Sequence, residues 1–220
     1  MDTDLYPYLS MGVEFTINVV HLWLPAIVIF IALTAVIWLR KRSLSYVLCF
    51  LIFGAYLLYT VDKVFFPIPV SGTYADVMKQ APWTAFINYI PFYFGPFSNL
   101  EDSLNTLLLN VILTIPFGFG INFLIPTQPR KMLRIAIAVG IGIEATQFII
   151  GLLIGYFYRY VDINDILMNA LGVLVGYVIF RVFAWLYLWA AQKLDMQLEG
   201  LAGYIHDVAS QAAGQQIPSP

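Results

Sequence analysis

The sequence is poor in charged residues and nearly lacks cysteine and histidine. Only 11% of the 220 residues are charged, against roughly 25% in ordinary soluble domains, and 60% are hydrophobic. The single cysteine, Cys49, lies inside an apolar run and excludes an internal disulfide. The chain carries 11 Lys and Arg against 13 Asp and Glu, with no basic patch, so its composition argues against a nucleic-acid partner.

The common catalytic signatures are also missing. The chain has no Walker loop, no His-Glu-x-x-His motif, no Cys or His pair for zinc and no Gly-x-Ser-x-Gly elbow, so no residue is recognisable as a nucleophile. The first residues carry no Lys or Arg. We therefore expect no cleaved signal peptide, and we expect membrane insertion to use the first apolar helix.

Long apolar runs dominate what remains. A helix that crosses the hydrocarbon core of a bilayer needs about 20 mostly apolar residues. The sequence therefore predicts an all-α integral membrane helical bundle of about five transmembrane helices plus a C-terminal amphipathic helix. The predicted spans are residues 20–39, 45–61, 104–125, 133–154 and 162–185.

The segments outside these spans have distinct characters. The composition of residues 5–18 predicts an interfacial segment, a helix docked on the bundle or a re-entrant segment. The connection at residues 62–103 is long enough to indicate a functional loop. We predict a transmembrane domain at residues 1–190, an amphipathic cytoplasmic helix at 191–213 and a disordered tail at 214–220. The apolar positions of that helix recur at steps of four, three, four and three, at Leu194, Leu198, Leu201, Ile205 and Val208.

Basic residues predict the orientation of the bundle. With five spans, eight Lys and Arg residues fall on one side of the membrane and three on the other. By the positive-inside rule, the N-terminus then lies outside and the C-terminus in the cytoplasm. The eight are Arg40, Lys41, Arg42, Arg130, Lys131, Arg134, Arg181 and Lys193, and the three are Lys63, Lys79 and Arg159.

The last predicted span carries a polar stripe. Asp162, Asp165, Asn169, Gly172 and Gly176 follow one another at steps of three, four, three and four, which places them along one face of a helix. The other residues of that helix are almost all apolar. Carboxylates and an amide above two glycines indicate a polar site against a closely packed neighbouring helix. Interhelical hydrogen bonding alone is the competing interpretation.

Polar residues on two other spans reach similar depths. At about 1.5 Å per residue, Asn110 and Asn169 lie roughly 9 Å, Gln147 roughly 12 Å and Glu144 roughly 16 Å below the outer ends of their helices. Buried ionisable groups in a bilayer face a bundle interior or a cavity, so we predict one outward-opening polar pocket with residues 88–97 as its lid. Its candidate ligand-binding residues are Asn88, Asn110, Gln147, Arg159, Asp162 and Asn169.

Different chemistries are open to such a pocket. Glu144 and Asp165 are candidate catalytic residues as acid or base. Asp162 and Asp165 are candidate metal ligands, because Mg²⁺ and Ca²⁺ prefer oxygen donors. Arg159 could contact a phosphate or carboxylate through its forked donors.

Four short motifs occur in order between residues 88 and 176. They are Asn88-Tyr-Ile-Pro91-Phe92, Asn110 with Ile115-Pro116-Phe117-Gly118, Glu144-x-x-Gln147, and Arg159-x-x-Asp162-x-x-Asp165-x-x-x-Asn169-x-x-Gly172-x-x-x-Gly176. In this order and spacing the chain resembles the VanZ-like family of bacterial membrane proteins. The resemblance implies a place in the bacterial cytoplasmic membrane and lowered susceptibility to teicoplanin and lipoglycopeptide antibiotics; it does not supply a reaction.

These observations support three hypotheses. In the first, the bundle transports nothing and binds an envelope lipid or a lipid-linked cell-wall precursor in its outer polar pocket. In the second, it is a membrane enzyme that modifies a lipid phosphate with acidic residues and a divalent metal. The third, a small lipid transporter or flippase, is weakened because the inner halves of the predicted helices are almost wholly apolar.

Overall fold

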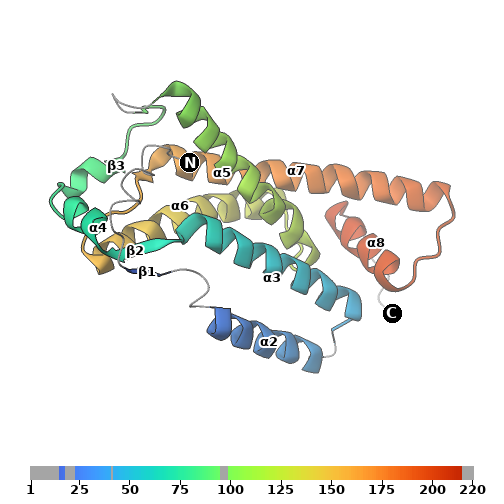
Figure 1. Cartoon of the computed structure of the whole chain (residues 1–220). Coiled ribbons are helices and arrows are strands. Elements are labelled where there is room, and N and C mark those ends of the chain that lie inside the picture. Colours follow the sequence, from blue (N-terminus) through green and yellow to red (C-terminus); the bar gives the residue numbers. More distant parts are fainter. Residues whose placement is uncertain (1–14, 18–22, 41, 95–98, 215–220) are drawn as a thin grey trace.

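The computed structural model of the chain describes residues 15–17, 23–40, 42–94 and 99–214 and consists mainly of helices (Figure 1). Within these residues, four helices are long and apolar enough to cross a membrane, and a shorter apolar helix precedes them. The fold is therefore the predicted all-α membrane bundle, and the protein is a multi-pass membrane protein. Its main helices are α2 (Trp23–Leu39), α3 (Leu44–Phe65), α5 (Leu100–Gly120), α6 (Pro129–Ile154), α7 (Ile163–Lys193) and α8 (Gly200–Ala212).

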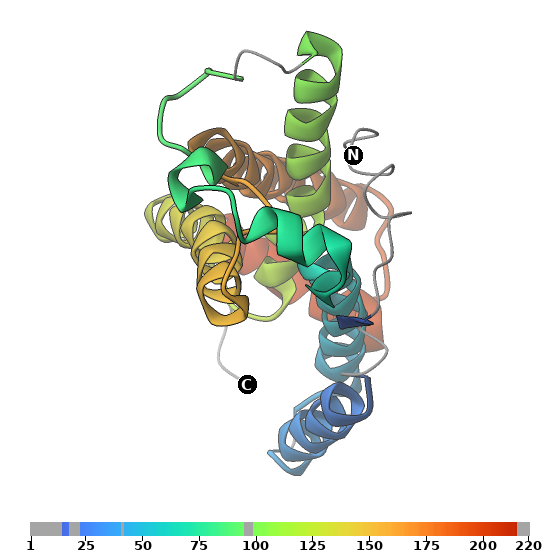
Figure 2. The same cartoon turned by 60° about the vertical axis from the view of Figure 1, so that its left-hand side comes forward.

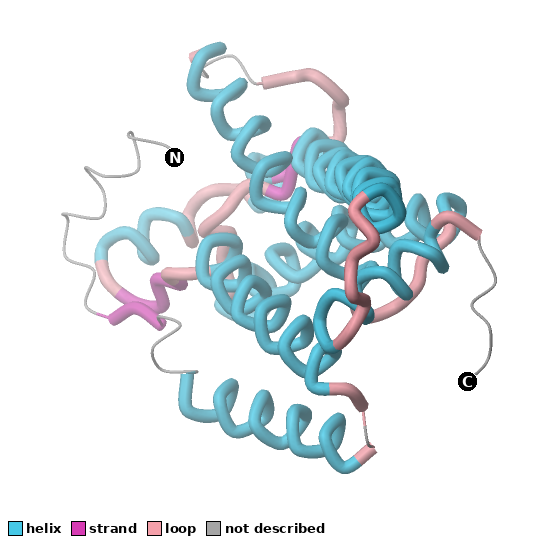
Figure 3. Tube along the Cα trace, turned by 90° about the vertical axis from the view of Figure 1, so that its right-hand side faces the viewer, coloured by secondary structure: helices cyan, strands magenta, loops and turns pink. Residues whose placement is uncertain are grey.

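The long helices alternate in direction. Figure 1 shows α3 and α6 running one way, and α2, α5 and α7 running the other. All three views place α2 at the edge of the bundle beside α3 (Figure 2 and Figure 3). This alternation gathers the ends of α3 and α6 and the starts of α5 and α7 at one end of the bundle, where the candidate site lies. Because the three basic residues assigned to the outside lie there, we call it the predicted outer end.

Helices α5 and α7 run in the same general direction and cross in very close contact (Figure 1). A Cβ atom at Gly176 would overlap the carbonyl oxygen of Ile115, and one at Gly118 would overlap that of Val173. At Gly172, a Cβ atom would overlap the Thr114 hydroxyl. The glycines of the polar stripe therefore permit backbone contact, as predicted from their spacing.

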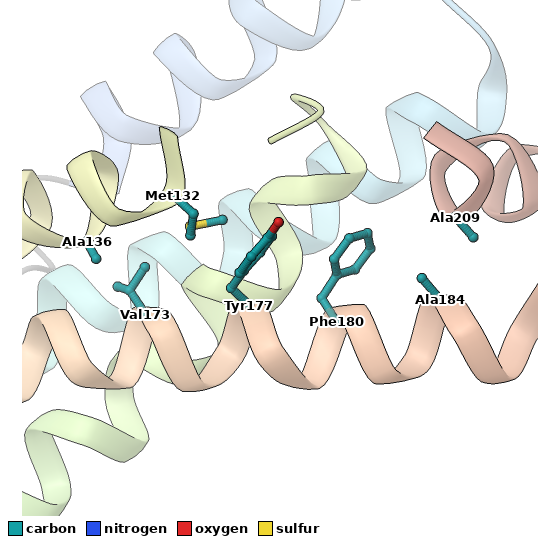
Figure 4. Packing of buried hydrophobic residues seen from close by; sticks show 7 residues of the cluster. All are labelled: Met132, Ala136, Val173, Tyr177, Phe180, Ala184 and Ala209. Atoms are coloured by element: carbon teal, nitrogen blue, oxygen red, sulfur yellow. The ribbon is translucent and has the colours of Figure 1, made fainter. Parts of the chain in front are cut away.

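The apolar core lies between α6 and α7 and reaches α8 (Figure 4). Its residues come from one face of each helix and are almost completely buried. They are Met132, Ala136, Val173, Tyr177, Phe180, Ala184 and Ala209.

The C-terminal region differs from the predicted boundaries. Helix α7 continues to Lys193, eight residues beyond the predicted end, and α8 begins only at Gly200 instead of residue 191. Asp195 and Gly200 both have positive φ angles, so the chain turns here and the apolar repeat that began at Leu194 does not form one helix. Helix α8 packs on the bundle, where the Tyr204 hydroxyl donates to the Phe123 carbonyl.

Short elements cover the predicted outer end. Strand β1 (Phe15–Ile17) pairs antiparallel with β2 (Ile68–Ser71), and β3 (Ile87–Asn88) pairs in parallel with β4 (Val161–Asp162). Between them lie α4 (Thr73–Met78) and the 3-10 helix η3 (Trp83–Phe86), which Figure 2 shows in front of the long helices. Residues 62–103 thus contain more regular structure than predicted, and residues 15–17 are a strand; the remainder of the segment 5–18 lies outside the described residues.

Candidate functional site

Polar side chains from three helices meet near the predicted outer end. Asn110 lies on α5, Glu144 on α6, and Asp165 and Asn169 on α7. The Asp165 carboxylate is close enough to interact with Glu144 and with the Asn110 amide. The Thr114 hydroxyl bridges the two helix backbones by donating to the carbonyls of Asn110 and Asn169, each at 2.9 Å. We call Asn110, Glu144, Asp165 and Asn169 the polar cluster.

Glu144 is anchored at the start of α7. The residue is 2% exposed, and its Oε2 accepts a hydrogen bond of 3.0 Å from the backbone N–H of Asp162. The unpaired N–H groups of a helix N-terminus carry partial positive charge, which favours nearby carboxylates. The N-terminus of α7 therefore stabilises the acids of the polar cluster.

Asp162 is the N-cap residue of α7, whose first residue is Ile163. We predicted that this helix begins at Asp162 itself. Its Oδ1 accepts hydrogen bonds from the Asn164 N–H at 2.7 Å and from Asn88 Nδ2 at 3.0 Å. Asn88 Nδ2 also donates to the carbonyl of Tyr93 at 2.8 Å. Asp162 and Asn88 therefore fix β3 and the following loop to the start of α7.

The two remaining candidate residues contact the end of α3. Gln147 is buried and donates to the carbonyl of Val64 at 3.1 Å. Arg159 Nη2 donates to the carbonyls of Phe66 at 3.3 Å and Lys63 at 3.5 Å, which caps the C-terminus of the helix. Among the described residues Arg159 makes no ion pair within 4.0 Å, although its charge acts on Glu144.

Three buried polar atoms at this site make no hydrogen bond within the described residues. They are Asn169 Oδ1, Arg159 Nε and Asn110 Nδ2; the Asn110 amide interacts with the Asp165 carboxylate but makes no hydrogen bond of standard geometry. The Asn169 side chain is only 2% exposed. Roughly 90% or more of buried polar groups in proteins have a partner, so these three atoms are free to bond a polar ligand or water.

The sequence-based prediction missed Asn164. This residue is 1% exposed; its Oδ1 accepts from the Phe92 N–H at 2.6 Å, and its Nδ2 donates to the Tyr93 carbonyl at 3.2 Å. It holds the described part of the predicted lid, residues 88–94, on the start of α7; residues 95–97 lie outside the described residues. Its position two residues after the N-cap of α7 could have indicated a role at the helix start. We overlooked it because it lies off the polar stripe.

The candidate metal ligands have a limited donor set. Within the part of the chain that the structure describes, no group of three His, Cys, Asp or Glu side chains is placed to hold a metal ion. Asp162 Oδ1 already accepts two hydrogen bonds. Amide and backbone oxygens can also ligate Mg²⁺ or Ca²⁺, so metal binding by Asp162 and Asp165 stays a prediction.

The turn between α6 and β4 is rigidly held by tyrosines. Tyr156 donates its hydroxyl to the Pro69 carbonyl, and Tyr158 donates to the Phe65 carbonyl at 2.9 Å. Burial raises the pKa of Tyr156 to about 12, with further contributions from Tyr74 and Tyr158, and burial also raises the pKa of Tyr158. Both phenols are therefore neutral hydrogen-bond donors at physiological pH.

Comparison with known proteins identifies the family. A model of the VanZ/LLP1 family matches residues 50–184, a wider range than the motifs at 88–176 and one that contains the whole polar cluster. No curated protein and no solved structure matches the chain. Because the family match covers more than half of the sequence, the chain belongs to the VanZ/LLP1 family.

Proposed function

We propose that the polar cluster binds the polar part of an envelope lipid or lipid-linked cell-wall precursor, at the outer face of a bacterial cytoplasmic membrane. The observation that carries this proposal is that two polar-cluster atoms, Asn110 Nδ2 and Asn169 Oδ1, make no hydrogen bond within the described residues. Arg159 Nε is a third such atom, and the charge of Arg159 acts on Glu144. Unpaired polar groups and buried acids cost free energy in a bilayer, so where they occur they usually line a ligand site or a transport pathway. Membership of the VanZ/LLP1 family supports the proposal. The antibiotic phenotype that the sequence resemblance implies favours a ligand of the cell envelope.

The available groups suit a ligand that offers both acceptors and donors. Asn110 Nδ2 and Arg159 Nε can donate to phosphate or carbonyl oxygens, and Asn169 Oδ1 can accept from a hydroxyl or amide. The carboxylates of Glu144 and Asp165 add acceptors at the same place. A phosphate-linked sugar or peptide headgroup has this mixture, whereas a hydrocarbon ligand does not.

Binding of this kind gives a route to lowered teicoplanin and lipoglycopeptide susceptibility. If the protein holds or shields an envelope lipid, membrane-anchored antibiotics meet an altered target at the outer face. This requires the predicted orientation, in which the basic ends of the helices lie in the cytoplasm.

The alternatives differ in what they require. The proximity of Glu144 and Asp165 favours the second candidate, an enzyme that modifies a lipid phosphate by acid–base chemistry. A transporter or flippase needs a polar path beyond the cluster, but Met132, Val173 and Phe180 pack the α6–α7 interface further along these helices. This packing disfavours transport.

A direct test is co-purification of envelope lipids with the full chain. Asn110→Leu should reduce the amount of bound lipid about tenfold, which corresponds to roughly 1.4 kcal/mol, when bound lipids are measured by native mass spectrometry. Asn105→Leu is the matched control, because Asn105 lies on the same helix but is exposed. Equal lipid retention by both variants would contradict the proposal, and loss of phosphate from the bound lipid would favour the enzyme.

A further inference from the structure

An apolar groove lies at the predicted outer end of the bundle, and the proposed function does not use it. It is formed by residues 78–86 on one side and by the end of α6 with its following turn on the other. Its volume of about 450 Å³ lies within the roughly 300–1,000 Å³ that is typical of small-molecule sites. No residue of the polar cluster lines it, so the groove is a separate feature.

The groove has a wall of stacked aromatic rings. The centroid of the Phe157 ring lies 6.2 Å from that of Phe86 and 5.3 Å from that of Phe148. A Cβ atom at Gly151 would come within 2.6 Å of Phe157 Cδ1, so glycine is needed for this ring to pack against α6. Phe86 and Phe157 are 8% and 4% exposed, so the packed rings form a fixed apolar wall, and a hydrocarbon chain can contact their exposed edges.

One cation stands at the groove. Of the described residues that line it, Lys79 alone is charged. Its Nζ lies 3.6 Å from Asp76 Oδ1 and 6.0 Å from the centre of the Tyr156 ring. Both side chains of the Asp76–Lys79 pair are well exposed, and such pairs contribute little to stability. Lys79 can therefore exchange Asp76 for an anionic group without a large energetic cost.

The groove also lies at the level of the membrane interface. From Gly155, which ends α6, to Phe148 the helix descends about 10 Å at 1.5 Å per residue. Trp83, a groove residue with 60% exposure, has the amphipathic ring that favours the headgroup region. The groove therefore extends from headgroup level toward the acyl chains.

From the cation, the aromatic wall and this depth we infer that the groove binds one acyl chain of an anionic phospholipid, with its phosphate on Lys79. The bilayer itself supplies such a lipid. This site is independent of ligand binding by the polar cluster.

The test measures tryptophan fluorescence of the full chain in nanodiscs. Lipids with brominated acyl chains quench a nearby indole, and the difference between wild type and Trp83→Phe isolates the signal of Trp83. We expect brominated phosphatidylglycerol to quench Trp83 more than twice as strongly as brominated phosphatidylcholine at equal content. Lys79→Gln and Lys79→Glu should remove this preference.

Lys63→Gln is the matched control. Lys63 is also exposed, lies at the same end of the bundle and pairs with a neighbouring acid, Asp62, at 3.3 Å, but it does not line the groove. It should keep the preference, as should Asp165→Asn, which separates this site from the polar cluster. Equal quenching of wild type by the two lipids, or a preference that survives both Lys79 substitutions, would overturn the inference.

Discussion

The Glu144 carboxylate accepts a hydrogen bond from the backbone N–H of Asp162 at 3.0 Å, which joins the middle of α6 to the N-cap of α7. This bond crosses the turn that carries Arg159. It brings a buried acid to the positive end of a helix and next to Asp165 on the first turn of that helix. The position of Glu144 is thus set by a backbone hydrogen bond, and Asp165 is placed by the first turn of α7.

The contact between α5 and α7 leads to a prediction about stability. Gly176→Ala places a Cβ atom onto the Ile115 carbonyl, and overpacking of this kind typically costs about 1–3 kcal/mol. We expect a lower midpoint of thermal unfolding in detergent, measured by loss of helical circular dichroism. Gly142→Ala is the control, since a Cβ atom there meets nothing within 4 Å. Equal midpoints for the two variants would show that α5 and α7 are not in backbone contact.

Asn110 should contribute to function at the expense of stability. An unpaired buried polar group costs about 1–3 kcal/mol, so Asn110→Leu should keep or raise the unfolding midpoint while ligand binding falls. Thr114→Val provides the contrast, because it removes hydrogen bonds to the carbonyls of Asn110 and Asn169 and should lower stability by about 1 kcal/mol. A strongly destabilised Asn110→Leu would instead assign this amide a structural role.

Asn164 should control the loop at residues 88–94. Asn164→Ala removes the acceptor for the Phe92 N–H and a donor to the Tyr93 carbonyl. We expect hydrogen exchange of the loop amides to accelerate about tenfold, for a loss of roughly 1.4 kcal/mol in local stability. Asn105→Ala, at an exposed position on α5, should leave this exchange unchanged. Unchanged exchange in Asn164→Ala would mean that other contacts hold the loop.

Periodicity was sufficient to predict the bundle and the shared face of Asp165 and Asn169, while the binding role of this face stays a prediction. Long apolar runs define transmembrane helices because the bilayer requires them. The steps between Asp165, Asn169 and Gly172 place these residues on one face whatever the neighbouring helix is. Depth along each helix then placed Asn110 and Glu144 at similar levels, and in the structure both interact with Asp165.

What periodicity could not predict depends on contacts between distant segments. The paired strands β3 and β4 contain only two residues each, and each forms because the other is present. Asn164 was overlooked because its partners, Phe92 and Tyr93, lie more than seventy positions earlier in the chain. At the C-terminus an apolar repeat of helical spacing was broken by backbone turns at Asp195 and Gly200, since tertiary packing overrides local pattern.

The most direct test of the proposed function is teicoplanin susceptibility in cells that carry wild type, Asp165→Asn or Glu144→Gln at matched membrane levels. Asp102→Asn, a change to an exposed acid in the first turn of α5, is the control. We predict that wild type and the control protect the cells, and that both polar-cluster variants insert normally but fall to the level of cells without the protein. Full protection by Asp165→Asn and Glu144→Gln would contradict a functional polar cluster, and a wild type that gives no protection would separate this chain from the family's antibiotic phenotype.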